Sequence, residues 1–143
     1  MIGLCWIDPA AWPDCAPRAA ARGVAIVLAD APDVVVSLDK HKVKQAIGNL
    51  LDNAIAASWP GMRVDVESSA EDGMVRIVVR DHGAGIAPEI RERLFTPFAT
   101  TKPDGIGLGL VLARELVQAH GGTLEWRAAA PGTAFLIELP RTG

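Results

Sequence analysis

The sequence predicts a single α/β domain, and three patterns support this. Residues 39–58 carry apolar side chains at helical spacing and form the longest helical pattern in the chain. A second helical pattern covers residues 110–120. Four shorter segments alternate apolar and polar side chains, as half-buried strands do: residues 62–67, 75–81, 123–127 and 133–139.

Size and composition fit this class. The chain has 143 residues, of which 50% are hydrophobic, so one compact domain with a core is expected. A net charge of -3 does not indicate a nucleic-acid partner. No apolar run approaches the roughly 20 residues that cross a bilayer, and no signal peptide is evident. We therefore expect a cytoplasmic location and no membrane contact by this segment, which is compatible with a membrane anchor elsewhere in the parent protein.

Cysteine and histidine usage gives no metal or disulfide signal. Cys5 and Cys15 are expected to be reduced thiols, because no secretory signal precedes them. The three histidines have no cysteine or histidine neighbours at ligand spacing, so no zinc site is expected.

Upstream of the long helix the patterns are short. Residues 2–7 fit an edge strand, and residues 9–22 fit a first helix interrupted by Pro13 and Pro17. Two further strands are predicted at residues 24–29 and 34–38.

The long helix carries an apolar stripe with two amides at its border. The stripe consists of Val43, Ala46, Ile47, Leu50 and Ala54, Asp39 is the expected N-cap, and residues 59–61 end the helix. Asn49 and Asn53 are four residues apart and lie on the same side. An asparagine oxygen suits Mg²⁺ that carries nucleotide phosphates, whereas two solvated or capping amides are the alternative.

The strand over residues 75–81 ends in an inward-pointing acid. Val75, Ile77 and Val79 face one way, and period two places Asp81 on the same apolar face. A buried carboxylate requires hydrogen-bond donors. The glycines that follow, in His82-Gly83-Ala84-Gly85, allow backbone and ligand to approach closely. Asp81 therefore fits the floor of a pocket for a ligand with an N–H donor, such as an adenine amine. A carboxylate that caps the following turn is the alternative.

A long connection then leads to a glycine-rich turn. A short helix is expected over residues 87–94, followed by a loop that carries Phe95, Phe98 and Lys102. Residues 105–109 read Gly-Ile-Gly-Leu-Gly and run into the helix of residues 110–120, which ends at two glycines. A glycine turn at a helix N-terminus favours phosphate, although the spacing matches neither a dinucleotide fingerprint nor a P-loop.

In their order, these motifs resemble the ATP-binding catalytic domain of sensor histidine kinases, in the superfamily shared with gyrase, heat-shock-90 chaperones and MutL. The similarity covers residues 24–140 and comprises an N box at 49–54, a first glycine box at 81–85, an F box at 94–98 and a second glycine box at 105–110. The Thr-Thr-Lys of residues 100–102 is most similar to the nitrogen-regulation and oxygen-sensing branch.

The resemblance implies a two-layer α/β sandwich of the Bergerat type, with a mixed sheet packed against about three helices. It implies Mg-ATP binding, with Asp81 and Thr133 at adenine, Asn53 and Asn49 at Mg²⁺, Phe95 and Phe98 anchoring a lid, and Asn49 and Lys102 acting in catalysis. The nucleotide contacts implied are Asn49, Asn53, Asp81, Gly83, Gly85, Ile86, Phe98, Thr101, Lys102, Gly105, Gly107, Leu108, Gly109, Leu110 and Thr133.

Two departures from the family pattern occur. Ala56 and Ala57 stand where many members carry a basic residue, and His82 replaces the commoner asparagine. None of the three histidines is followed by an acidic residue, so none matches the phosphoacceptor signature.

The chain is therefore expected to be the catalytic part of a larger dimeric kinase. It would be a single domain over residues 1–143 and would lack the acceptor hairpin. This domain is expected to bind ATP but not to autophosphorylate. Its partners would be the dimerisation and histidine phosphotransfer domain of the parent kinase and a response regulator. An anti-sigma-type serine kinase and a non-enzymatic nucleotide- or partner-binding module are the alternatives.

Overall fold

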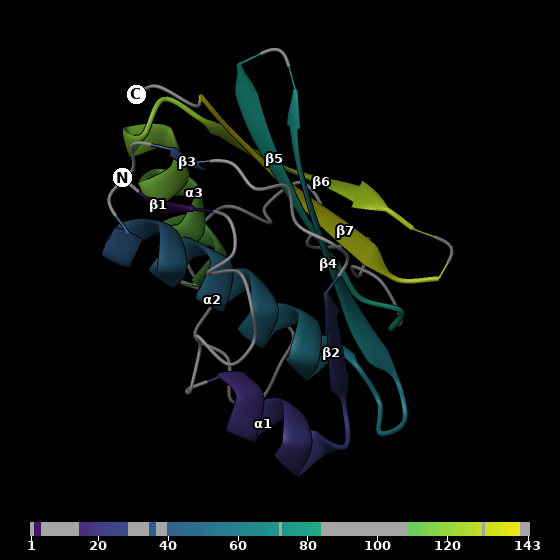
Figure 1. Ribbon diagram of the computed structural model, residues 1–143. Helices are drawn as coiled ribbons and strands as arrows, with labels where there is room; N and C mark the ends of the chain where they lie inside the picture. The colour runs from purple at the N-terminus through teal and green to yellow at the C-terminus, as the bar shows by residue number, and fades with distance from the viewer. Residues whose placement is uncertain are drawn as a thin grey trace.

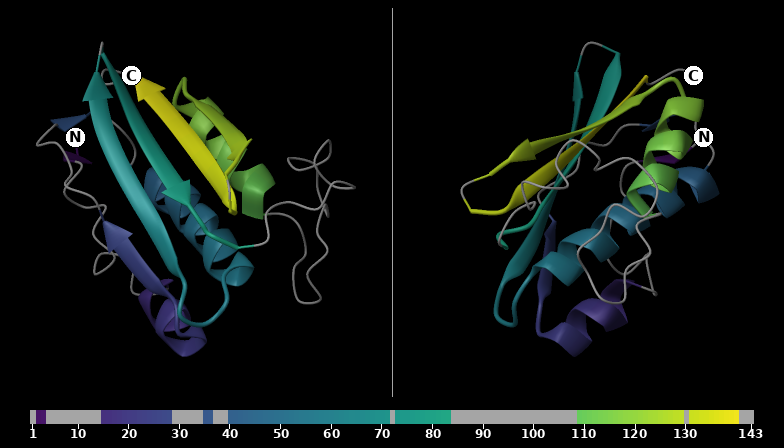
Figure 2. Two further views of the ribbon diagram at one scale, coloured as in Figure 1. Left: turned by 90° about the vertical axis from the view of Figure 1, so that its right-hand side faces the viewer. Right: turned by 180° about the vertical axis from the view of Figure 1, so that it is seen from behind.

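The computed structural model describes residues 2–3, 15–28, 35–36, 40–71, 73–83, 109–129 and 131–140. Within them the chain forms a two-layer α/β sandwich: three helices cover one face of a five-stranded sheet (Figure 1). Seen from the right-hand side of Figure 1, the strands lie in front and the helices behind them (Figure 2, left). The predicted fold class is thus confirmed.

The elements lie close to the predicted ranges. The helices are α1 (Cys15–Arg22), α2 (Lys40–Ala57) and α3 (Gly109–Ala119). The strands of the main sheet are β2 (Ala25–Leu28), β4 (Arg63–Glu71), β5 (Met74–Arg80), β6 (Thr123–Ala128) and β7 (Thr133–Pro140). Their order is β2-β4-β5-β7-β6. Strand β2 runs parallel to β4 and the other neighbours are antiparallel, so the sheet is mixed.

Two expectations for the N-terminal region need correction. The segment predicted as an edge strand contributes β1 (Ile2–Gly3), which pairs with β3 (Val35–Val36) in a separate two-stranded sheet. The edge of the main sheet is taken by β2, which pairs with β4. Pro17 does not interrupt α1. It lies in the first turn of the helix, where a backbone N–H would have no intrahelical acceptor.

The core lies between the helices and the sheet. Strand β5 has its predicted alternation, with Val75, Ile77 and Val79 each at most 1% exposed. The predicted stripe of α2 is buried at Ala46, Ile47, Leu50 and Ala54, and Leu51 and Ile55 widen it. From α3, Ala113 and Val117 complete this layer. Burial of these apolar side chains is the main force that holds the two layers together.

The C-terminal end of α2 is tied to α1. Arg22 donates from Nε to the Ile55 carbonyl oxygen at 3.2 Å and from a terminal nitrogen to the Ser58 carbonyl oxygen at 3.0 Å. A second bond from that nitrogen reaches the Ala56 carbonyl at 3.3 Å. A cation at a helix C-terminus satisfies carbonyls that have no intrahelical donor and complements the helix dipole. Arg22 therefore fixes the position of the last turn of α2.

Candidate nucleotide-binding site

Asp81 lies directly after β5 and points into the protein. It is 2% exposed, and its backbone N–H donates to the Thr133 carbonyl oxygen at 3.0 Å, which continues the pairing of β5 with β7 by one residue. The predicted inward direction of this side chain is confirmed. Thr133, at the start of β7, is 3% exposed, so two buried polar residues face each other across adjacent strand ends.

The Asp81 carboxylate caps the turn that follows this residue. The Gly83 N–H donates to Asp81 Oδ1 at 3.0 Å, which is the turn-capping role named above as the alternative. An ionised carboxylate has about four acceptor positions on its two oxygens. The cap therefore fixes the orientation of the carboxylate relative to the turn.

Close backbone packing brings this turn against α2. A Cβ added to Gly83 would lie 2.0 Å from the Ala57 carbonyl oxygen, so only glycine fits here. Asn49, Asn53 and Ala57 are spaced by four residues and form one row along α2. With a rise of about 1.5 Å per residue, the row is about 12 Å long. It leads from the Asp81 turn to the two predicted amides.

The opposite side of the turn is packed equally closely. A Cβ added to Gly132 would lie 2.1 Å from the Asp81 carbonyl oxygen, and Gly132 has φ +96°. Asp81 is therefore held between α2 and the start of β7 by two glycines.

Asn49 has an unsatisfied amide group. Its Nδ2 is buried and has no hydrogen-bond partner among the described residues. Rotation of the amide by 180° exchanges the nitrogen and the oxygen with almost no change of shape. The position suits a ligand group or metal that the amide can contact, and amide oxygens are typical ligands of Mg²⁺. The Asn49 amide is thus chemically suited to hold Mg²⁺ or a phosphate group.

The structure describes seven of the predicted site residues. Asn49, Asn53, Asp81, Gly83 and Thr133 lie as given above; Gly109 begins α3, and Leu110 packs against the edge of the core. The other eight lie outside the described residues: Gly85, Ile86, Phe98, Thr101, Lys102, Gly105, Gly107 and Leu108. The expected helix over residues 87–94, Phe95 and the N-cap Asp39 also lie outside them.

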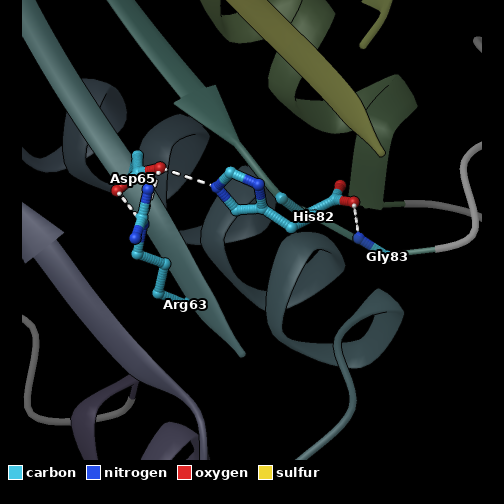
Figure 3. Close-up of polar contacts among 5 residues, drawn as sticks. Arg63, Asp65, His82 and Gly83 are labelled. Carbon is cyan, nitrogen blue, oxygen red and sulfur yellow. Dashed lines mark hydrogen bonds and ion pairs between the residues drawn. The ribbon is translucent and has the colours of Figure 1, made fainter. Parts of the chain in front are cut away.

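Sequence reasoning missed a polar cluster beside the site. The His82 ring lies 2.7 Å from Asp65, and Arg63 donates from Nε to both oxygens of Asp65 at 3.1 and 3.2 Å (Figure 3). Partial burial raises the pKa of Asp65. Hydrogen bonds from His82 and Arg63, together with the charges of these two residues, lower it by more, so the pKa of Asp65 lies below its ordinary value. Period two places Arg63 and Asp65 on the same face of β4, which is the part of this cluster that the sequence could indicate.

Fold and sequence together define the class of protein. The family model of histidine kinase-, DNA gyrase B- and HSP90-like ATPases matches residues 38–143. The chain belongs to this family.

Relatives within the family are sensor kinases. The chain is 39% identical over 127 residues to the C4-dicarboxylate transport sensor protein DctB of Rhizobium meliloti, covering 87% of this chain and 20% of that protein. It is 34% identical over 128 residues to the sensor histidine kinase ZraS of Klebsiella oxytoca, covering 87% of this chain and 28% of ZraS. The chain thus spans 20% to 28% of the length of these two relatives. The branch within the kinases stays a prediction.

Solved structures of histidine kinases share the fold. The nucleotide-free catalytic domain of histidine kinase ThkA matches with a TM-score of 0.85 and 28% identity over 99% of this chain and 97% of that chain. Full-length ShkA in complex with AMPPNP matches with a TM-score of 0.74 and 34% identity over 87% of this chain and 27% of ShkA.

None of the described helices is long and apolar enough to cross a membrane.

Proposed function

We propose that this chain binds Mg-ATP and supplies the γ-phosphate to a histidine on a separate dimerisation domain of a two-component signalling kinase. The observation that carries the proposal is the buried Asp81 carboxylate, held in a capped turn that packs against the helix bearing Asn49 and Asn53. Membership of the ATPase family and the AMPPNP complex of the relative ShkA support the same assignment.

The row along α2 suggests how the nucleotide is oriented. Asp81 would accept a hydrogen bond from the adenine amine near Ala57, with Thr133 in support. Asn53 and Asn49, one and two helical turns further on, would hold Mg²⁺ and the phosphates. Mg²⁺ would supply neutralisation of phosphate charge. Lys102 and the glycine turn of residues 105–109 would contact the phosphates, as the family resemblance implies.

The chain's share of the chemistry is positioning. Phosphoryl transfer depends mainly on alignment and on neutralisation of charge, and little on covalent chemistry of the protein. No histidine here is followed by an acidic residue, so we propose that the acceptor lies on the dimerisation domain of the parent kinase. A response regulator is the proposed final recipient. ThkA is known in complex with the response regulator protein TrrA.

Calorimetric titration with AMPPNP and Mg²⁺ tests the binding. The wild-type chain should bind one nucleotide, and Asp81→Asn should weaken binding at least about tenfold, because an NH₂ group would then face the donor of the base. Glu138→Gln makes the same acid-to-amide change on the opposite face of the sheet and should leave affinity unchanged. A wild-type chain that does not bind rejects the function, and full affinity of Asp81→Asn rejects the role of Asp81.

Radiolabelled ATP tests the location of the acceptor. The chain alone should retain no acid-labile phosphate, whereas a dimerisation domain added in trans should become labelled. Acid-labile label on the isolated chain would contradict the proposal.

A further inference from the structure

The polar cluster of Arg63, Asp65 and His82 lies on the sheet face that no described helix covers (Figure 3). The side chains of Asp65 and His82 are 23% and 20% exposed, whereas that of Arg63 is 61% exposed. Hydrogen bonds between groups that are largely shielded from water are held in a more definite geometry than exposed ones. The His82–Asp65 hydrogen bond therefore has a better defined geometry than the Arg63–Asp65 contact.

His82 and Asp81 are neighbours in sequence whose side chains are held on opposite sides of the sheet. Asp81 is buried on the helix side, while the His82 ring bonds to Asp65 on the other side. The backbone on either side of the pair is tied at two more points, by the Asp81 N–H to the Thr133 carbonyl oxygen and by the Gly83 N–H to Asp81 Oδ1. A rotation of this backbone that moved the Asp81 carboxylate would therefore break the His82–Asp65 bond as well.

The direction of the bond follows from the charges around it. The lowered pKa of Asp65 keeps this carboxylate ionised near neutral pH, where it only accepts hydrogen bonds. The Nε2–H group of His82 is therefore the hydrogen-bond donor, and Asp65 Oδ2 is the acceptor. The Arg63 cation on β4 donates to Asp65 and favours its ionised form. Arg80 on β5 is the register partner of Asp65.

We propose that His82, held by Asp65, is a positioning residue that fixes the direction of the Asp81 carboxylate and thereby sets the selectivity for adenine over purines that lack the 6-amino group. This inference rests on the proposed function. Its physical basis is that a hydrogen bond weakens steeply when its angle departs from linearity, so a carboxylate free to tilt discriminates less between bases.

The first test needs no nucleotide. Hydrogen exchange of the Gly83 amide reports the bond to Asp81 Oδ1, because that amide exchanges only when the turn opens. His82→Ala should raise its exchange rate about fivefold, which corresponds to the loss of one modest hydrogen bond. His82→Gln retains an N–H donor on a side chain of similar reach and should restore most of the protection. An unchanged Gly83 rate in His82→Ala overturns the inference.

The second test compares the affinities for Mg-ATP and Mg-ITP. ITP carries an oxygen in place of the 6-amino group, so a fixed acceptor at Asp81 should disfavour it. His82→Ala and Asp65→Ala should each lower the ATP-to-ITP affinity ratio about fivefold, mainly through ATP. The ATP-to-ITP affinity ratio of the double variant should be no lower than that of either single variant, because the two substitutions remove the same contact. An unchanged ATP-to-ITP affinity ratio overturns the inference, whether both affinities fall equally or neither changes.

A matched control comes from the same sheet face. Arg76 pairs with Glu138 at 3.2 Å on β5 and β7, away from Asp81. Arg76→Ala removes an ion pair of comparable chemistry and should change neither Gly83 exchange nor the ratio. A wild-type chain that bound neither nucleotide would reject the proposed function, and the Gly83 exchange rates would still decide whether His82 fixes the turn.

Discussion

Gly132→Ala is expected to destabilise the protein for two separable reasons. Gly132 has φ +96°, and a left-handed backbone costs an L-residue about 1–2 kcal/mol. The new Cβ would also lie 2.1 Å from the Asp81 carbonyl oxygen and 2.9 Å from His82 Cα. Relief of that contact requires a backbone shift of roughly 1 Å, and overpacking of this kind costs about 1–3 kcal/mol. The expected loss is therefore about 2–5 kcal/mol.

Gly73→Ala is the matched control, because it carries the strain without the clash. Gly73 has φ +76°, and no heavy atom of the described residues lies within 4 Å of a Cβ built there. It should lose only about 1–2 kcal/mol. Both substitutions reduce the entropy of the unfolded chain equally, so the difference isolates the packing of Gly132 against the Asp81 turn.

Urea unfolding followed by tryptophan fluorescence measures this difference. With a slope of about 2 kcal/mol/M, the midpoint of Gly132→Ala should lie about 1 M below that of Gly73→Ala. The slopes should stay equal, since the surface exposed on unfolding is the same. Equal midpoints for the two variants would refute the close packing of β7 against Asp81.

Three further predictions follow from the described contacts. Gly48→Ala in α2 should stabilise the protein by about 0.5–1 kcal/mol, because no heavy atom of the described residues lies within 4 Å of the added Cβ and alanine is the better helix former; a thermal melt that shows a loss would contradict this. Arg22→Ala should cost about 1–2 kcal/mol through three lost hydrogen bonds and the helix dipole, and chemical denaturation that shows no loss would remove Arg22 as the cap of α2. Asp65→Asn should cost about 0.5 kcal/mol at pH 7. Because the pKa of Asp65 is lower in the folded protein, its contribution is present above the ordinary aspartate pKa and disappears as the pH falls through the folded value. Unfolding curves of the two proteins should therefore converge in acid, and a difference that persisted there would refute this assignment.

The sequence was most informative where local periodicity decides the structure. Period two in β5 placed Asp81 on the buried face, and helical spacing placed Asn49 and Asn53 along one side of α2. Both rules need only neighbouring residues, because side-chain direction in a regular element follows from its backbone geometry. The fold class followed from the same patterns together with the family resemblance.

Contacts between segments far apart in sequence were not predictable in this way. The bonds from Arg22 to the end of α2 span more than 30 residues, and those of His82 to Asp65 span 17. They depend on how elements are placed by the core, which periodicity does not specify. The pairing of β1 with β3 was missed for the same reason, since β2 occupies the sheet edge next to β4.

The central claim is that the amides of α2 and the Asp81 turn meet at one nucleotide. Amide NMR spectra of the labelled chain, recorded during titration with Mg²⁺ and AMPPNP, test it most directly. The largest shifts should fall on the side-chain amides of Asn49 and Asn53 and on the backbone amides of Gly83 and Thr133, with none on Thr123 at the far end of β6. Shifts confined to other parts of the sheet, with those four groups unmoved at saturation, would contradict the account.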